Sequence, residues 1–143
     1  MVFIKDEGSV FEAPIDALWK YIQSPAHGQA HRSIRNRQTQ PAGENTQLAS
    51  MERNVGGSWV KVVNRLTILP PLGIAFEALE GPFAGSKFVY IYTPLGAKTG
   101  IAVYGEYASP QIPAGQLESA VRASLEEGFN EDAPAIRGFA AKK

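Results

Sequence analysis

The sequence contains no cysteine. Disulfide bridges, thiolate catalysis and zinc sites built from cysteine are therefore excluded. No apolar run approaches the roughly 20 residues that a membrane-spanning helix needs, and charges follow the first residues too early for a signal peptide. We therefore expect a cytoplasmic protein without a membrane span.

The chain also lacks an excess of charge of either sign, since 14 basic residues balance 14 acidic ones. A nucleic acid or an anionic membrane needs a local surplus of cations. The densest basic stretch, residues 31–37, alternates like a strand with one solvated face, with an anion site as the alternative. Glycine patterns that cradle phosphates are absent. We expect no nucleic-acid partner and no cofactor.

Glycine and proline clusters divide the middle of the chain into segments of similar length. Glycine supplies a positive φ and proline presets φ without a donor, so each cluster can end a strand and reverse it. Several segments are rich in β-branched and aromatic residues. Together with a first strand over residues 2–11, this pattern predicts an antiparallel meander over residues 32–40, 46–55, 58–69, 74–80, 86–93 and 99–109.

Helical patterns flank the meander. After the first strand comes a short helix with an apolar stripe, and Ser24 and Pro25 then suit the start of a second. Beyond Pro113, a long pattern gathers its apolar residues within one arc between Leu117 and Phe139. The stripe of the first helix consists of Ile15, Leu18, Trp19 and Ile22. With 143 residues, the chain fits a single domain over residues 1–143.

The widths of these elements predict a cavity. Seven strands about 4.8 Å apart form a sheet about 30 Å wide, whereas a helix with its side chains is about 10 Å across. The long helix therefore covers about a third of one face. The short helices, curling of the sheet, an inner void or a ligand must cover the rest. We predict that Trp19 plugs one end of the curled sheet, and that Gly128 thins the long helix beside Phe129.

Two stretches, "FEAPIDALWKYIQSP" (residues 11–25) and "LEEGFNEDAPAIRGF" (residues 125–139), together with this order of elements, resemble the START-like superfamily, also called SRPBCC. It includes birch-pollen-allergen-type lipid binders, polyketide cyclases and START lipid-transfer domains. The resemblance covers essentially the whole chain. It implies an α+β helix-grip fold, in which a curved seven-stranded antiparallel sheet grips a long C-terminal helix around a hydrophobic cavity, with two short helices after the first strand.

Three functions are compatible with this resemblance, because a fold alone does not set function. The first is binding or carriage of a small hydrophobic or aromatic molecule. The alternative is a polyketide cyclase-like or dehydratase-like enzyme that acts on such a ligand through Arg65, Tyr90, Glu106 or His31. The third is an accessory protein-binding module. The chain is a monomer or a homodimer; the sequence leaves this open.

The ligand site is predicted on one face of the strands and on the long helix. Aromatic side chains with a polar tip suit a ligand cavity, so we expect Phe88, Tyr90 and Tyr92 to point inward. Their alternative is to fill the core or to lie on the outer face, because a period of two does not say which face is concave. The predicted set is His31, Trp59, Arg65, Phe76, Phe88, Tyr90, Tyr92, Val103, Leu125 and Phe129.

Three ionisable residues need separate comment. His27 and His31 share the spacing of a metal pair, but zinc needs a third ligand and Gly28 weakens the helix. We therefore expect no metal site and ordinary histidines at the surface or cavity mouth, with His31 as a polar group or proton donor at the rim as the alternative. Asp132 lies within the apolar arc. Since Pro134 should kink or restart the helix, Asp132 is predicted to cap the restarted turn; the alternative is an acid presented to the cavity.

Overall fold

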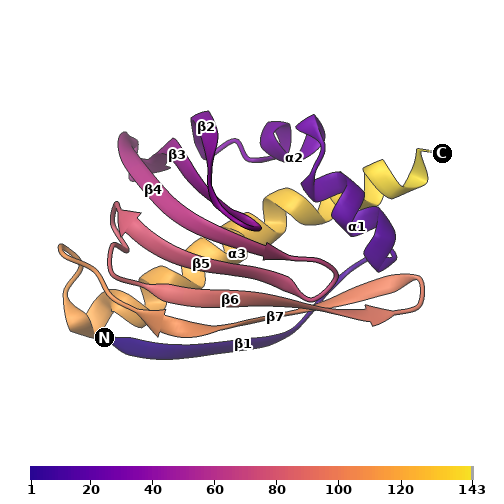
Figure 1. Ribbon diagram of the computed structural model, residues 1–143. Coiled ribbons are helices and arrows are strands. Elements are labelled where there is room, and N and C mark those ends of the chain that lie inside the picture. Colours follow the sequence, from indigo (N-terminus) through magenta and orange to yellow (C-terminus); the bar gives the residue numbers. More distant parts are fainter. Residues whose placement is uncertain (143) are drawn as a thin grey trace.

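Seven antiparallel strands form one sheet that curves around the C-terminal helix (Figure 1). This computed structural model describes residues 1–142. The order across the sheet is β1-β7-β6-β5-β4-β3-β2. The strands are β1 (Val2–Phe11), β2 (Ile34–Gly43), β3 (Thr46–Val55), β4 (Ser58–Leu69), β5 (Gly73–Glu80), β6 (Lys87–Leu95) and β7 (Lys98–Tyr107), and the helices are α1 (Ile15–Ile22), α2 (Pro25–Ala30) and α3 (Ala114–Ala141).

The predicted meander is confirmed, with several strand ends shifted by one to three residues. The largest shift is in the strand predicted over residues 32–40, which begins at Ile34 and extends through Pro41 to Gly43; Pro41 pairs with Gln47. Pro41 fits there because β2 lies at the edge of the sheet, where a missing N–H costs no ladder bond. The reversal is confined to Glu44 and Asn45, and Asn45 takes the positive φ of 56°.

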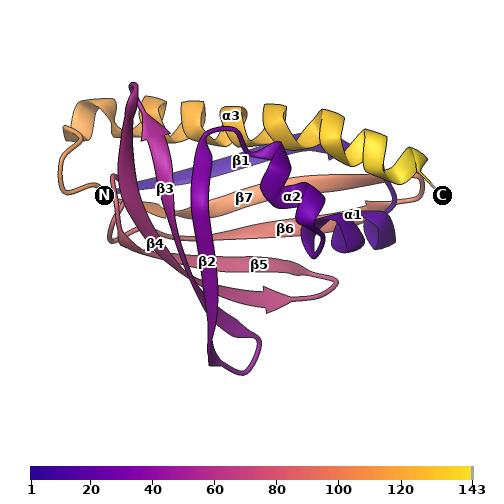
Figure 2. The ribbon, with the colours of Figure 1, turned by 90° about the horizontal axis from the view of Figure 1, so that it is seen from above.

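Helix α3 lies lengthwise across the concave face, with α1 and α2 beside its C-terminal half (Figure 2). It is a single helix with Pro134 inside it, so the prediction of a restarted turn capped by Asp132 is wrong. Pro134 and Asn130 are both exposed, and water can therefore solvate the carbonyl that Pro134 leaves without a donor. Asp132 instead accepts a hydrogen bond from Tyr21.

Two apolar clusters hold α3 on the sheet. One surrounds Trp19, which is 8% exposed, meets Tyr92 edge-on at 5.6 Å and donates its indole N–H to the carbonyl of Pro71 at 3.3 Å. This confirms that Trp19 belongs to the core at one end of the sheet. The other cluster packs the first half of α3 against β1 and β7, through Ile4, Tyr107, Leu117 and Val121. Within residues 1–142, no helix is long and apolar enough to span a membrane.

Candidate functional site

A cavity of about 860 Å³ lies between the concave face of the sheet and α3. All seven strands and the three helices contribute to its wall. Alternation along each strand selects the inward residues: in β4 these include Asn64 and Leu66, and in β6 they are Phe88, Tyr90 and Tyr92. The inward orientation predicted for the three β6 aromatics therefore holds.

The cavity brings together eight of the ten residues that the sequence singles out. They come from the α2–β2 connection, from three neighbouring strands and from the middle of α3. Their position in the wall follows from the structure, whereas their role in binding stays a prediction. These residues are His31, Phe76, Phe88, Tyr90, Tyr92, Val103, Leu125 and Phe129.

Trp59 and Arg65 are not in this wall, and their predicted placement is wrong. Both lie on the convex face, because the alternate residues of β4 point inward. The guanidinium of Arg35 lies 4.1 Å above the Trp59 ring, and Arg65 pairs with Glu77. Glu106, named for the enzyme hypothesis, is exposed and pairs in register with the outward Lys87.

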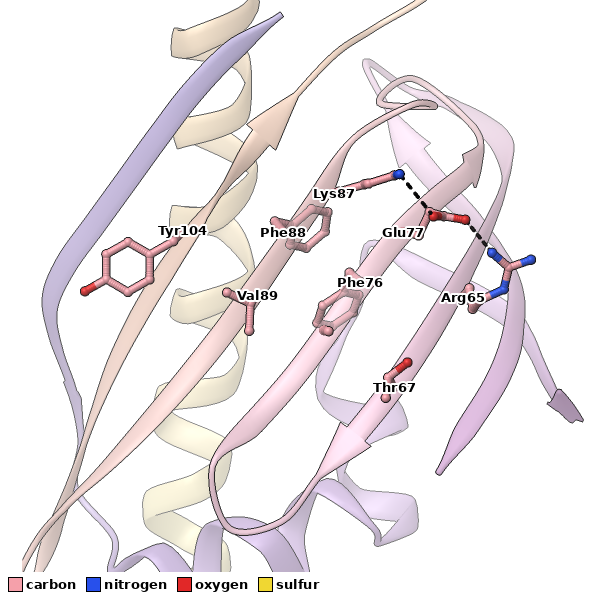
Figure 3. Close-up of a pocket in the computed structure, with 9 residues that line it drawn as sticks. Arg65, Thr67, Phe76, Glu77, Lys87, Phe88, Val89 and Tyr104 are labelled. Atoms are coloured by element: carbon pink, nitrogen blue, oxygen red, sulfur yellow. Dashed lines mark hydrogen bonds and ion pairs between the residues drawn. The ribbon is translucent and has the colours of Figure 1, made fainter. Parts of the chain in front are cut away.

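A second, smaller hollow of about 390 Å³ lies on this convex face (Figure 3). Glu77 links two cations there, since it pairs with Arg65 and lies 3.8 Å from Lys87 Nζ. These side chains are solvent-accessible, and pairs of this kind contribute about 0–1 kcal/mol. The apolar cavity beneath α3 is therefore the better candidate for a ligand site.

Stacked aromatic rings form one side of the inner cavity. Phe88 stacks on Phe76 at 4.8 Å and on Tyr107 at 4.9 Å, so the three rings make a continuous strip across β5, β6 and β7. Phe129 of α3 stacks on Phe11 at 5.1 Å. Flat aromatic surfaces of this kind suit a planar apolar ligand, because offset stacking adds to area burial.

A few polar groups interrupt the apolar wall. Burial raises the pKa of Tyr90 to about 12, so its hydroxyl stays protonated at neutral pH. The buried hydroxyl of Tyr107 has no hydrogen-bond partner among residues 1–142. Arg53 of β3 donates to Ser124 Oγ of α3 at 2.7 Å and so links the sheet to the helix across the cavity. Tyr90 and Arg53 therefore supply polar groups among the apolar residues of this wall.

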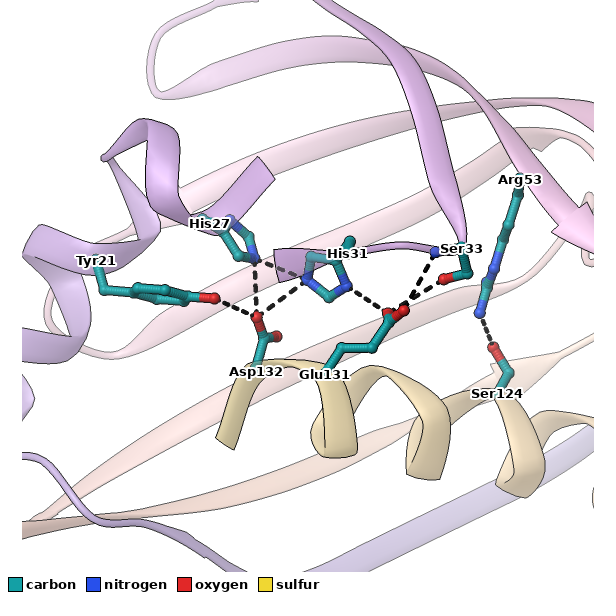
Figure 4. A network of polar contacts seen from close by, with 8 residues as sticks. All are labelled: Tyr21, His27, His31, Ser33, Arg53, Ser124, Glu131 and Asp132. Carbon is teal, nitrogen blue, oxygen red and sulfur yellow. Dashed lines mark hydrogen bonds and ion pairs between the residues drawn. The ribbon is translucent and has the colours of Figure 1, made fainter. Parts of the chain in front are cut away.

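One end of the cavity carries a compact polar cluster (Figure 4). The α1–α2 region and the start of β2 place two histidines, a tyrosine and a serine against two adjacent acids of α3. Each acid contacts more than one of these partners. We call this group the histidine cluster; it consists of Tyr21, His27, His31, Ser33, Glu131 and Asp132.

His31 is the centre of the histidine cluster. Its Nδ1 donates to Glu131 Oε1 at 2.8 Å, and its Nε2 lies 3.1 Å from Asp132 Oδ1. Tyr21 donates its hydroxyl to the same Asp132 oxygen at 2.8 Å. Ser33 donates its backbone N–H and its hydroxyl to Glu131 at 3.2 and 3.1 Å. Both acids are therefore held by donors from the opposite side of the cavity.

The two histidines differ in their proton affinity. Burial disfavours the charged form of His31, but hydrogen bonds and the charges of Asp132 and Glu131 outweigh it and raise the pKa of His31. For His27, burial outweighs the attraction of Asp132 and lowers the pKa. The environment of the cluster thus favours one charged and one neutral imidazole.

The structure selects the alternatives stated for His31 and Asp132. His31 is a polar group in the cavity wall, and Asp132 is an acid presented to the cavity. Sequence reasoning missed Glu131, which falls outside the apolar arc, and Arg53, whose inward position depends on strand register. The one available signal was the acid at position 132 on an otherwise apolar helix face.

Comparisons with known proteins identify the fold. No family model matches the chain, and no curated protein matches its sequence. A START superfamily protein from Mycobacterium smegmatis superposes with a TM-score of 0.77 at 12% identity, over 95% of this chain and 97% of that one. For the Zhui aromatase/cyclase from a Streptomyces species, the TM-score is 0.74 at 16% identity, over 99% and 95% of the two chains.

The structure of Ara h 8.0201 is similar as well, with a TM-score of 0.73 at 12% identity over 99% of both chains. These likenesses cover nearly the whole length of the compared chains. At such low identities they concern the fold alone. The chain therefore has the START-like helix-grip fold, as the resemblance in its sequence predicts.

Proposed function

We propose that this chain binds a small, largely apolar molecule in the cavity between the sheet and α3. The observation that carries the proposal is the cavity itself. Its volume of about 860 Å³ falls within the range of about 300–1,000 Å³ typical of ligand sites. Side chains that would fill the space are missing at Gly128, where an added Cβ meets no atom within 4 Å.

The wall supports an aromatic ligand of limited polarity. The strip formed by Phe76, Phe88 and Tyr107 offers a flat apolar surface. Tyr90 supplies a neutral donor, and the Arg53–Ser124 link supplies a second polar anchor. A planar ring system with one or two oxygen atoms matches this distribution.

A polyketide cyclase-like or dehydratase-like enzyme is the second candidate. It is favoured by the histidine cluster and Tyr90, which line the same cavity and supply ionisable groups at one end of it. The Zhui protein of similar fold is an aromatase/cyclase. The third hypothesis is an accessory protein-binding module. It is less well supported, because such a module would have its cavity filled by side chains, whereas this chain has a cavity of about 860 Å³.

The binding test uses two leucine substitutions in α3. Gly128→Leu places a side chain in the cavity, whereas Gly138→Leu makes the same change at an exposed position of the same helix, where an added Cβ also meets no atom within 4 Å. Both gain helix propensity. In titrations with a fluorescent apolar probe, Gly128→Leu should weaken binding at least about tenfold, as expected when a leucine occupies ligand volume, while Gly138→Leu should match wild type.

Native mass spectrometry of protein purified from its own source complements the titration, since it detects a small molecule that travels with the chain. Equal probe affinity in a folded Gly128→Leu variant would place the probe elsewhere. No probe binding by wild type would reject the ligand-binding proposal and favour the accessory module. Turnover of an added polyketide-like substrate by wild type would favour the enzyme.

A further inference from the structure

Three donor atoms of the histidine cluster converge on one point. His27 Nε2 and His31 Nε2 are 3.1 Å apart. Asp132 Oδ1 lies 3.1 Å from His31 Nε2 and 3.7 Å from His27 Nε2. Ligand atoms bound to one ion at 2.0–2.2 Å are about 2.8–3.6 Å apart in octahedral or tetrahedral geometry. The triangle formed by the three atoms therefore has the size of a metal-binding face.

The three atoms face one another directly. His31 Nε2 lies 3.1 Å from both Asp132 Oδ1 and His27 Nε2. A cation at the centre of the triangle would therefore be within reach of a lone pair on each of the three atoms.

The groups around the triangle orient it as outer-shell partners of a metal site do. Glu131 accepts the Nδ1 proton of His31 at 2.8 Å, so that a metal ion which displaces the Nε2 proton meets a lone pair directed inward. Ser33 holds Glu131 with two hydrogen bonds, and Tyr21 donates to Asp132. The side chains of His31 and Asp132 are only 15% and 18% exposed, so the site is largely shielded from competing water.

We propose that His27, His31 and Asp132 bind a divalent first-row transition-metal ion, such as Zn²⁺, at the α2 end of the cavity. Two imidazoles and a carboxylate are suitable ligands for such ions. All three residues line the cavity. Three protein ligands leave at least one coordination position, which a water molecule or an oxygen atom of a cavity ligand can fill. The sequence predicts no metal site because the third ligand comes from distant α3.

The composition of the chain limits the number of residues that could bind the metal elsewhere. The sequence has 2 histidines and no cysteine, so protein without an affinity tag has no other imidazole or thiolate ligand. Calorimetric titration with Zn²⁺, and visible absorption on titration with Co²⁺, should each show one equivalent bound to wild type. His31→Ala and Asp132→Asn should weaken binding at least about 100-fold, through loss of a ligand.

Two further variants distinguish a residue that orients a metal ligand from a residue that does not contact the site. Glu131→Gln should weaken binding about 10- to 100-fold, the usual effect of an outer-shell partner. Glu126→Gln, an exposed change on the same helix, should leave affinity unchanged. Circular dichroism and urea unfolding establish that each variant is folded. An absence of stoichiometric binding by wild type, or unchanged affinity in folded Asp132→Asn, would overturn the proposal.

A measurement on wild type alone avoids any folding defect of the variants. In protein labelled with ¹⁵N-histidine, addition of Zn²⁺ should shift the ring nitrogens of both His27 and His31. A shift of neither ring, or of one only, would contradict the proposed site. The test uses metal without an apolar probe, so its outcome is independent of the cavity ligand proposed above.

Discussion

Two residues of the same type show how placement on this sheet decides what a side chain contributes. Trp19 is buried at the end of the curved sheet, where it contacts Tyr92 and donates to a backbone carbonyl. Trp59 lies on the convex face beneath Arg35. The first fills the core, whereas the second covers a solvated strand surface. Their chemical identity is the same, and their energetic roles differ.

Trp19→Ala should therefore reduce the free energy of unfolding by about 3–5 kcal/mol, the range for a large aromatic removed from a packed core. Trp59→Ala should cost about 1 kcal/mol, through lost surface packing and the cation–π contact. Urea titration of wild type and both variants measures the difference. Similar losses in the two variants, or a loss below 1 kcal/mol for Trp19→Ala, would show that the core assignment is wrong.

Helix α3 combines three tasks along its length. Its first half packs on β1 and β7 through Leu117 and Val121, its middle borders the cavity, and its last turns pack near α1 through Ile136. The helix continues through Pro134 because packing of its apolar face outweighs one missing backbone hydrogen bond. Because the helix is continuous, Glu131 and Asp132 lie within contact distance of the histidines.

Replacing the internal proline tests that account of α3. Pro134→Ala restores the N–H that a continuous helix lacks, at the cost of a more flexible unfolded chain. We expect the variant to be more stable by about 1–2 kcal/mol in urea unfolding. Glu126→Ala, an exposed change on the same helix, should stay within about 0.5 kcal/mol of wild type. A neutral or destabilising Pro134→Ala would instead support a helix that restarts at this proline.

At the scale of the whole molecule, the core is divided. One apolar cluster lies beneath α1 and the end of α3, and another lies beneath the beginning of α3. The cavity of about 860 Å³ lies under the helix that joins them. Because atoms that border a void lose packing contacts, a ligand that fills it should couple binding to folding.

An apolar probe at about 100 times its dissociation constant should raise the free energy of unfolding by about 2.7 kcal/mol, the value for a ligand that binds only the native state. Urea unfolding with and without probe measures this gain. Gly138→Leu should retain it, whereas Gly128→Leu, with at least about tenfold weaker binding, should keep at most about 1.4 kcal/mol of it at the same probe concentration. An unchanged midpoint for wild type at saturating probe would indicate binding that does not depend on the folded cavity.

Local patterns in the chain are enough to identify the elements and the fold. Turn clusters, strand propensity and one amphipathic arc are local properties, and they identify the meander, the two short helices and the long helix. The gripping arrangement follows because an apolar helix face must be buried against a sheet that is wider than the helix. The same periodicities group Phe88, Tyr90 and Tyr92 on one face, since alternate residues of a strand share a face, and they place Leu125 and Phe129 within one helix arc.

Which face of the sheet is concave, and which distant residues meet, depends on how the helices and strands pack together. Alternation leaves two equivalent faces for a strand, so the pattern of β4 does not distinguish the face of Trp59 and Arg65 from the face of Leu66, which lines the cavity. The meeting of His31 with Asp132 depends on the path of α3 beyond Pro134. Such contacts arise from helix packing over a curved sheet, and no spacing within either segment encodes them.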